Sequence, residues 1–430
     1  MIRPAFSLAV LSLAFIPAIP AAAAPESPTP ANGKPIPLTD PSRFGPPQAQ
    51  GQQTPQMKKL QDAGIYPGQT GSLTFLRWRG DNPPVVFHAG LWGNQITNEH
   101  AALLPSLPEL ESLTVYEGAL DDAAAESLAK LPKLRRLSFA PVDRFQKNGF
   151  TRIQWSYPWL PTVENRPRLT GKALEALRAL PLLDSLDLRD TRVRSTDLGV
   201  LASFAKLGEV GLPHPIDAET IRHLRACKSV GSLVLGDREI SVSEIELLAG
   251  LPSLKRLTLR QARLSADALA AMEKLPKVTA LTLYDCGITD AQLAQLGKPP
   301  SLTQLELVRN QIEGPGLARL TSFSLQKLEL MMNNLSNASL PHLAALNTVE
   351  DLQLAYNVAI TDAGIQSGIL QGMKQLKNLE IRGLTGVTDA SLKALSQFGH
   401  LKQIGIRETK ISWESVDTMR AAMPETRVFK

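Results

Sequence analysis

An internal repeat of about 24 residues runs through most of this chain and restricts its fold more than any single motif does. Each copy begins with an apolar residue and places two more at its fourth and sixth positions, most clearly in the copies that begin at Leu254, Val278 and Leu302. Units of this size pack mainly against their neighbours, so the repeat predicts an elongated solenoid. The copies begin at Val86, Leu110, Leu134, Leu183, Leu207, Val230, Leu254, Val278, Leu302, Leu325, Val349, Leu376 and Leu401.

Each copy is predicted to hold a short strand followed by a helix. Leu281 and Leu283 alternate with polar residues, which is the period of a strand. Ile288 and Leu293 then follow at helical spacing, and a proline after the helix returns the chain to extended backbone. A Thr-Asp pair stands before several helices, where a hydroxyl or a carboxylate can accept from the unpaired first-turn N–H groups, and we expect the acids to be the caps. The pairs are at 289–290, 361–362 and 388–389.

These residues form a pattern that resembles the leucine-rich repeat family, and the helical half resembles its ribonuclease-inhibitor-like and cysteine-containing types. The resemblance covers about four-fifths of the chain. It implies an α/β solenoid shaped as a horseshoe, with a parallel β-sheet on the concave face and helices on the convex face. The geometry agrees, since strands stack about 4.8 Å apart and helices need roughly 8 to 10 Å.

The family also favours Asn or Cys just after the strand, which stabilises the turn. Thr or Ala replaces that residue in three copies, where we expect weaker order in the turn. The favoured residue is present at Asn94, Cys286, Asn310, Asn333 and Asn357, and it is replaced at Thr191, Ala262 and Thr409.

The chain is predicted to have four parts. Residues 1–23 have the charged start, apolar core and small-residue end of a secretory signal peptide, with cleavage near Ala23. Residues 24–56 are rich in proline and glutamine and are predicted to be a disordered linker. Residues 57–85 form an N-terminal cap with a strand at 73–78, and 86–430 is the repeat domain, with about thirteen repeats, an insertion at 140–168 and a C-terminal cap at about 412–430.

These segments predict an exported protein, periplasmic or secreted, with no membrane span in the mature chain. The apolar run near the N-terminus is short for a span, and no later segment is apolar enough to cross a bilayer. The sequence does not separate periplasm from medium. It also leaves the oligomeric state open.

Composition argues against several functional classes. A formal charge of +5 over 430 residues is too dilute for a nucleic-acid binder. The six histidines are scattered without metal-ligand spacing, and no phosphate loop or serine elbow is present, so we expect no cofactor, no metal and no enzymatic activity. Ser127 and Lys130 have the spacing of acyl-serine enzymes, but they lie in a repeat helix without the companion motifs.

Cys227 and Cys286 lie three repeats apart, too far for a disulfide, and are predicted to be free, buried thiols.

Side chains that flank the second and third leucines of each strand are predicted to point into the concave face. One row holds stacked carboxylates and the next holds arginines and aromatic rings. The carboxylates repel unless cations neutralise them, so we expect the adjacent arginines to pair with them, with a partner's basic group as the alternative. The aromatic and methionine residues either anchor an interface or fill the strands. The predicted partner-binding residues of this face are Arg260, Tyr284, Glu306, Arg309, Glu329, Met331, Tyr356, Glu380, Arg382 and Arg407.

The insertion at 140–168 is the second candidate contact surface, because loops on a rigid scaffold commonly carry function. In a chain that is only 5% aromatic it holds Arg152, Trp155, Tyr157 and Trp159, which are residue types enriched at binding hot spots. Either these rings contact a partner or they pack on the side of the solenoid.

The sequence therefore predicts an exported leucine-rich repeat scaffold that binds a protein through its concave face and the aromatic insertion. A host-directed bacterial effector is the first alternative, because similar domains occur in virulence proteins, although the export signal argues against it. Cell-envelope glycan binding and an unrecognised enzyme are the others.

Overall fold

The computed structural model describes residues 74–79, 85–91, 97–115, 119–139, 167–213 and 215–430. All of them lie in a unit that spans Gln50–Lys430. The predicted signal peptide and linker, and the insertion up to residue 166, lie outside the described residues.

The described strands form a 15-stranded open sheet together with a separate two-stranded one. The first strand of the large sheet is antiparallel to the second, and every later strand is parallel to its neighbour. The strands of the large sheet are β1 Thr74–Arg79, β2 Val85–Leu91, β3 Ser112–Val115, β4 Arg136–Phe139, β5 Ser185–Asp187, β6 Glu209–Gly211, β7 Ser232–Gly236, β9 Arg256–Arg260, β11 Ala280–Tyr284, β12 Gln304–Val308, β13 Lys327–Glu329, β14 Asp351–Gln353, β15 Asn378–Glu380, β16 Gln403–Gly405 and β17 Arg427–Phe429, and the small sheet holds β8 Glu239–Ile240 and β10 Arg263–Leu264.

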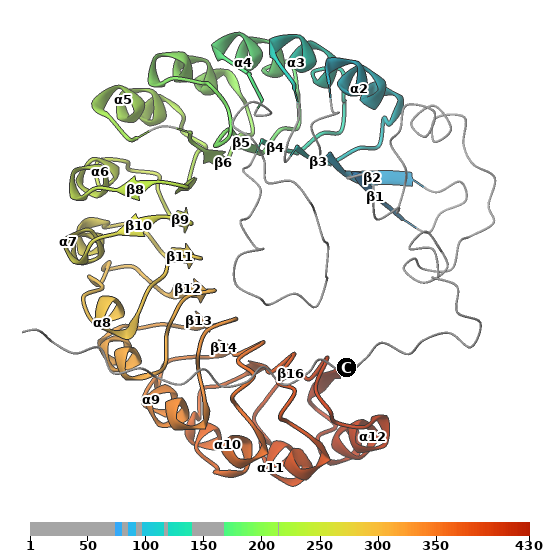
Figure 1. The fold of residues 1–430 in the computed structure, drawn as a ribbon, viewed down its shortest axis with the longest axis vertical. Helices are drawn as coiled ribbons and strands as arrows, with labels where there is room; N and C mark the ends of the chain where they lie inside the picture. Colours follow the sequence, from blue (N-terminus) through green and yellow to red (C-terminus); the bar gives the residue numbers. More distant parts are fainter. Residues whose placement is uncertain (1–73, 80–84, 92–96, 116–118, 140–166, 214) are drawn as a thin grey trace, which may run out of the picture. The chain divides into compact units, whose positions relative to one another are not determined.

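A helical segment follows the strand in each repeat and lies on the outer side of the curve, while the large sheet lines the inner side (Figure 1). The predicted α/β solenoid is therefore confirmed. The α-helices are α2 Asn98–Leu103, α3 Asp122–Leu128, α4 Gly171–Leu177, α5 Ala218–Ala226, α6 Val242–Leu248, α7 Ala266–Ala270, α8 Asp290–Leu293, α9 Leu340–Ala344, α10 Asp362–Gln366, α11 Leu392–Ser396 and α12 Trp413–Ala422, and the 3₁₀ helices are η2 Leu104–Ser106, η4 Ser195–Ser203, η5 Ala271–Lys274, η6 Pro315–Ser322, η7 Asn337–Ser339, η8 Leu370–Gly372 and η9 Asp389–Ser391.

Strand pairing follows the repeat, position by position. Leu281 on β11 lies between Leu257 on β9 and Leu305 on β12, so each fourth-position residue pairs with its counterparts in the neighbouring repeats. The same register crosses the insertion, because Leu137 on β4 pairs directly with Leu186 on β5. The insertion therefore leaves the strand ladder unbroken.

The apolar residues at the fourth and sixth positions fill one core that runs along the whole described solenoid. Leu281, Leu283, Leu305 and Leu307 are fully buried. Burial of this kind stabilises each repeat by about 1.5–3 kcal/mol per large apolar side chain. The sheet face opposite this core carries the third, fifth and seventh positions and is open to contacts.

Buried asparagines tie successive turns together after the strands. The side-chain nitrogen of Asn333 donates to the carbonyl oxygens of Leu307 and Leu330, and its oxygen accepts from the N–H of Ile312. Asn310 and Asn357 are also buried at the same place in their repeats. In the copy with cysteine, the Sγ of Cys286 donates to the Leu259 oxygen at 3.4 Å.

In the Thr-Asp pairs, the threonine hydroxyls of Thr289 and Thr388 cap their own helices, by accepting from the N–H groups of Gln292 and Ala390. The expectation that the acids would be the caps is wrong. The Asp290 carboxylate accepts from the N–H groups of Glu313, Gly314 and Gly316 in the following repeat. The Asp362 carboxylate likewise accepts from both the N–H and the hydroxyl of Thr388. Carboxylates at helix starts therefore link one repeat to the next, because the neighbouring turn presents several unpaired donors within reach.

Candidate binding surface

The inner face of the sheet carries the third, fifth and seventh residues of each repeat, because successive strand residues point to opposite sides. Fourth- and sixth-position residues are buried, whereas most fifth- and seventh-position side chains of β11 to β16 are partly exposed. One further residue, at the eighth position, adopts left-handed backbone where the strand ends. This holds at Asp237, Gln261, Asp285, Arg309, Met332, Tyr356, Gly383 and Glu408.

Lys327 bridges the stacked carboxylates of β12 and β13 and offsets one of their two charges. Its Nζ lies 2.8 Å from a Glu306 oxygen and 3.5 Å from a Glu329 oxygen. Burial alone lowers the pKa of the Lys327 ammonium, but the bonds and charges of the two glutamates outweigh it, and the pKa is raised. Burial and the neighbouring Glu306 charge raise the pKa of Glu329. Internal pairing therefore occurs, but through a third-position lysine rather than through the seventh-position arginines that we expected.

Arginines of the seventh and eighth positions make other contacts. The guanidinium carbon of Arg260 lies 4.3 Å from the centre of the Tyr284 ring, and that of Arg309 lies 6.0 Å from the same centre. Both guanidinium groups are near enough for a cation–π attraction that helps to hold the ring, the Arg260 contact being the closer. The sequence had grouped these three residues as contact candidates, and the structure brings them together on the repeats of β9, β11 and β12.

A second aromatic cluster lies farther along the sheet. The Arg382 Nη2 is 2.6 Å from a Glu408 oxygen, and the Tyr356 hydroxyl donates to the same carboxylate at 3.1 Å. The Tyr356 ring packs over Gly383, where an added Cβ would collide with it. Burial and the Glu408 carboxylate raise the pKa of Tyr356 against the opposing charge of Arg382. Two predicted residues, Tyr356 and Arg382, thus meet through Glu408, which the sequence analysis missed.

Near β5 and β6, an arginine of the same row does pair with its fifth-position acid. The Arg189 Nε lies 3.0 Å from Oδ1 of Asp187, and Nη2 lies 2.8 Å from Oδ2. The pair is well shielded, since the Arg189 side chain is only 6% exposed. Gly211 leaves the room for it, because a Cβ there would collide with the Asp187 carboxylate.

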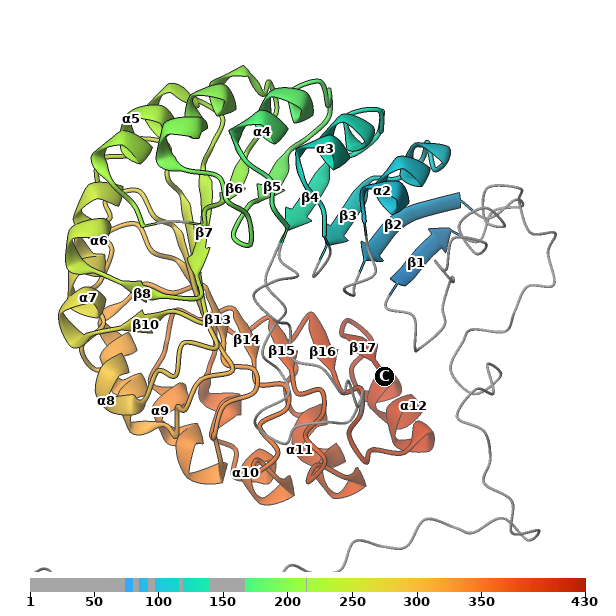
Figure 2. The ribbon, with the colours of Figure 1, turned by 45° about the horizontal axis from the view of Figure 1, so that its top comes forward.

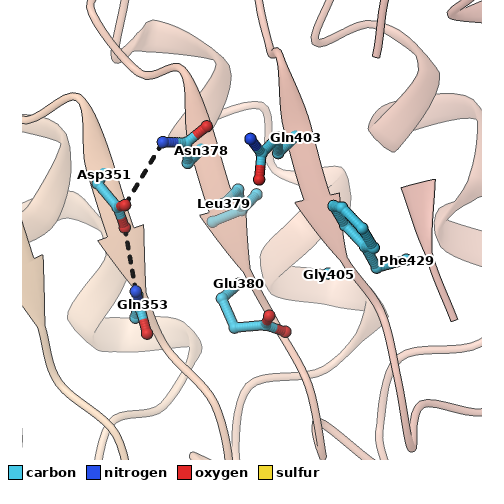
Figure 3. Close-up of a pocket in the computed structure, with 8 residues that line it drawn as sticks. All are labelled: Asp351, Gln353, Asn378, Leu379, Glu380, Gln403, Gly405 and Phe429. Atoms are coloured by element: carbon cyan, nitrogen blue, oxygen red, sulfur yellow. Dashed lines mark hydrogen bonds between the residues drawn. The ribbon is translucent and has the colours of Figure 1, made fainter. Parts of the chain in front are cut away.

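A pocket of about 110 Å³ opens on the inner face between β14 and β17 (Figure 3). These strands lie near the C-terminal end of the sheet (Figure 2). Asp351 and Glu380 supply carboxylates, and Gly405 forms the floor between Glu380 and Phe429 (Figure 3). The Phe429 side chain is 42% exposed. The other lining residues are Gln353, Asn378, Leu379 and Gln403.

The remaining predicted contact residues are placed as follows. Met331 is partly exposed on the turn side of β13, and Arg407 is exposed beyond β16. Arg152, Trp155, Tyr157 and Trp159 lie outside the described residues. The third-position residues Lys327, Asp351, Asn378 and Gln403 were not predicted from the sequence, although the period of a strand places them on the same face.

Both cysteines are free, Cys227 buried and Cys286 partly buried. Burial raises the pKa of the Cys227 thiol to about 11 and that of Cys286 to about 12. Within the described ranges, no cluster of three or more His, Cys, Asp or Glu side chains could hold a metal ion. No helix in the described part of the chain has the length and apolarity needed to span a bilayer.

Comparison with known proteins supports the repeat assignment. Residues 298–320 match a family model described as a leucine-rich repeat. No curated protein matches the chain. The match and the unbroken strand register from β2 to β16 make this a leucine-rich repeat protein. Its assignment to the ribonuclease-inhibitor-like or cysteine-containing type stays a prediction.

The chain is similar to many solved structures, including the following three at low identity. An internalin of Listeria monocytogenes is 17% identical, with 76% of this chain and 82% of that chain covered and a TM-score of 0.39. A leucine-rich repeat protein of Leptospira interrogans is 16% identical, with 76% and 92% covered and a TM-score of 0.34. TLR13, solved in complex with ssRNA13, is 17% identical with a TM-score of 0.42, and the alignment covers 77% of this chain but half of that one.

Proposed function

We propose that this protein is an exported scaffold that binds a protein partner through the inner face of its sheet. The observation that carries the proposal is the row of arginine, tyrosine and methionine side chains at the seventh and eighth positions, held partly exposed on a rigid sheet. Arg260, Tyr284 and Arg309 form one such anchor, and Tyr356 with Arg382 forms another. Tyrosine and arginine are enriched at interface hot spots because they offer large contact area at modest entropy cost.

The energetics favour contact with a folded partner. Side chains on strands keep their positions without a partner, so little conformational entropy is lost when a second surface docks. The face carries both charge signs within a few residues, as in the Lys327 and Glu306 pair. Such a surface discriminates between partners by charge complementarity more than by apolar area.

A matched pair of substitutions tests the use of the inner face. Arg407→Ala removes an exposed arginine from the inner side, and Arg222→Ala removes one from helix α5, where the side chain is 67% exposed. Mature protein beginning near Ala24 would capture partners from envelope and culture fractions. The proposal predicts that the first variant loses a partner that the second retains. Equal capture by both variants, each folded by circular dichroism, would argue against the inner face.

The insertion is tested in the same experiment. A version in which residues 143–166 are replaced by a short Gly-Ser link removes Trp155 and its aromatic neighbours while the register of β4 and β5 supports the fold. Loss of the partner from this version places part of the contact in the insertion. Retention limits the contact to the inner face.

Export is tested at the N-terminus. We propose that the signal at 1–23 is cleaved, so the protein recovered from its native host begins near Ala24. An intact Met1 would instead favour the alternative of an injected effector.

A further inference from the structure

Two places on the inner face share the same arrangement of a carboxylate over a glycine but differ in what the carboxylate contacts. In each, a fifth-position carboxylate lies over a glycine at the fifth position of the next repeat, and an added Cβ would collide with that carboxylate. The first is Asp187 over Gly211, and the second is Glu380 over Gly405. In both, the carboxylate accepts a hydrogen bond from the backbone N–H two residues later, that of Arg189 at 3.1 Å and that of Arg382 at 2.9 Å.

At the first place an arginine guanidinium contacts the fifth-position carboxylate, and at the second place the corresponding arginine contacts a different acid. Arg189 folds back onto Asp187 and donates to both of its oxygens. Arg382 occupies the same repeat position, but its guanidinium pairs with Glu408 at 2.6 Å. Glu380 therefore has no ion-pair partner among the described residues, although the molecule shows that this arrangement accepts a guanidinium.

We propose that the pocket between β14 and β17 binds an arginine side chain of the protein partner, with Glu380 as its principal acceptor. The inference rests on the proposed function and names the chemistry that one part of that surface recognises. Asp351 supplies a second carboxylate, and the structure describes no cationic residue in the pocket lining. A planar guanidinium that donates to a carboxylate in two bonds gains more than a neutral donor does.

The rest of the lining fits such a ligand. The partly exposed Phe429 ring stands across Gly405 from Glu380 (Figure 3), where it can stack on a guanidinium plane. The amide of Gln403 makes no hydrogen bond to any residue that the structure describes, and the bonds from Gln353 and Asn378 to Asp351 are long, at 3.3 and 3.4 Å. These amides can turn toward a ligand at little cost.

The test uses a short probe in place of the unidentified partner. The peptide acetyl-Gly-Arg-Gly-amide is titrated calorimetrically into the full mature chain, beside the same peptide with citrulline, which keeps the shape and removes the charge. Methyl glucoside is the third ligand, because a neutral sugar is the other occupant that acidic and amide side chains with an aromatic ring can hold. We expect the arginine peptide to bind, to weaken with salt, and to bind about tenfold or more tightly than the citrulline peptide.

Variants of the pocket residues test whether the arginine peptide binds in the pocket. Glu380→Gln and Asp351→Asn keep the size of the side chain, and each is expected to weaken the arginine peptide about tenfold or more. Glu350→Gln is the matched control, because Glu350 pairs with Lys377 outside the pocket and the variant loses the same charge. If a charge variant fails to fold, binding of the arginine peptide to Phe429→Leu tests the pocket instead.

Several outcomes would overturn the proposal: no binding of the arginine peptide, equal binding of the citrulline peptide, or equal weakening by Glu350→Gln. Binding of the glucoside alone would also exclude it. Failure here remains distinct from failure of the proposed function, because partner capture that depends on Arg407 while the pocket variants capture normally would keep the scaffold and reject the pocket.

Discussion

The side-chain oxygen of Asn357 accepts a hydrogen bond from the backbone N–H of Asn333, one repeat earlier, at 3.1 Å. The same side chain donates to the carbonyl oxygens of Leu330 and Leu354, both at 2.8 Å. Asn357 is fully buried, so water cannot replace these partners. One amide thus satisfies backbone groups of two successive turns, which makes the asparagine positions the links between repeats.

Asn357→Ala should therefore destabilise the solenoid strongly. Each buried backbone group left without a partner costs roughly 1–3 kcal/mol, and the substitution leaves several. Asn347→Ala is the matched control, because Asn347 is exposed and its loss should change stability by less than about 0.5 kcal/mol. Chemical denaturation of both variants measures the difference. Similar stability of the two would mean that the asparagine link is unimportant.

The Asp362 carboxyl should make the free energy of unfolding depend on pH in the acidic range. Burial alone would raise the pKa of this carboxyl, but hydrogen bonds from Ser391 and Thr388 outweigh it, and the pKa is lowered. A lowered folded-state pKa contributes stability above the unfolded value, near pH 4, and this contribution is lost as the pH falls through the folded value. Asp362→Ala should thus be less stable than the parent at pH 7, and the gap should narrow below pH 4. Denaturation curves across that range test it, and a gap independent of pH would contradict the assignment.

Glu329 should give the opposite dependence of stability on pH. Burial and the Glu306 charge raise the pKa of Glu329, so the charged form is disfavoured in the folded state. The stability linked to this group is present below the unfolded pKa and is lost as the pH rises through the folded one. Glu329→Gln, which mimics the protonated form, should be more stable than the parent at pH 7 and equal to it near pH 3. Glu350→Gln, at an exposed pair, should show no such gain.

The parts predicted well from sequence are those set by strict periodicity. The spacing of Leu281, Leu305 and their equivalents fixes which residues enter the core, and strand pairing then follows without further information. Local side-chain partners were harder to predict, because an acid such as Asp290 stands at the start of its own helix but bonds to N–H groups of the next repeat. The choice depends on which N–H groups remain unpaired in the folded solenoid.

On the inner face, too, only some of the side-chain contacts could be predicted from the sequence. Alternation places Lys327 beside Glu306 and Glu329, so the third-position row could have been read from the sequence. The pairing of Arg382 with Glu408 could not, since Glu408 lies in a turn with left-handed backbone, where side-chain direction departs from strand alternation. The pocket depends on that departure, because the arginine that would fill it points elsewhere.

If the pocket binds an arginine as proposed, Glu408 keeps Arg382 away from Glu380, and removal of the Glu408 charge should close the site from within. In the Glu408→Gln variant, Arg382 loses its charged partner, and the Asp187 and Arg189 pair shows that a seventh-position guanidinium can fold onto the fifth-position acid of its own repeat. We expect Arg382 to fold onto Glu380 and the arginine peptide to bind several-fold more weakly, measured by calorimetry. The double variant Glu408→Gln with Arg382→Gln removes the internal competitor and should restore binding. If the double variant binds as weakly as the single one, Glu408 supports the pocket directly, and competition by Arg382 is excluded.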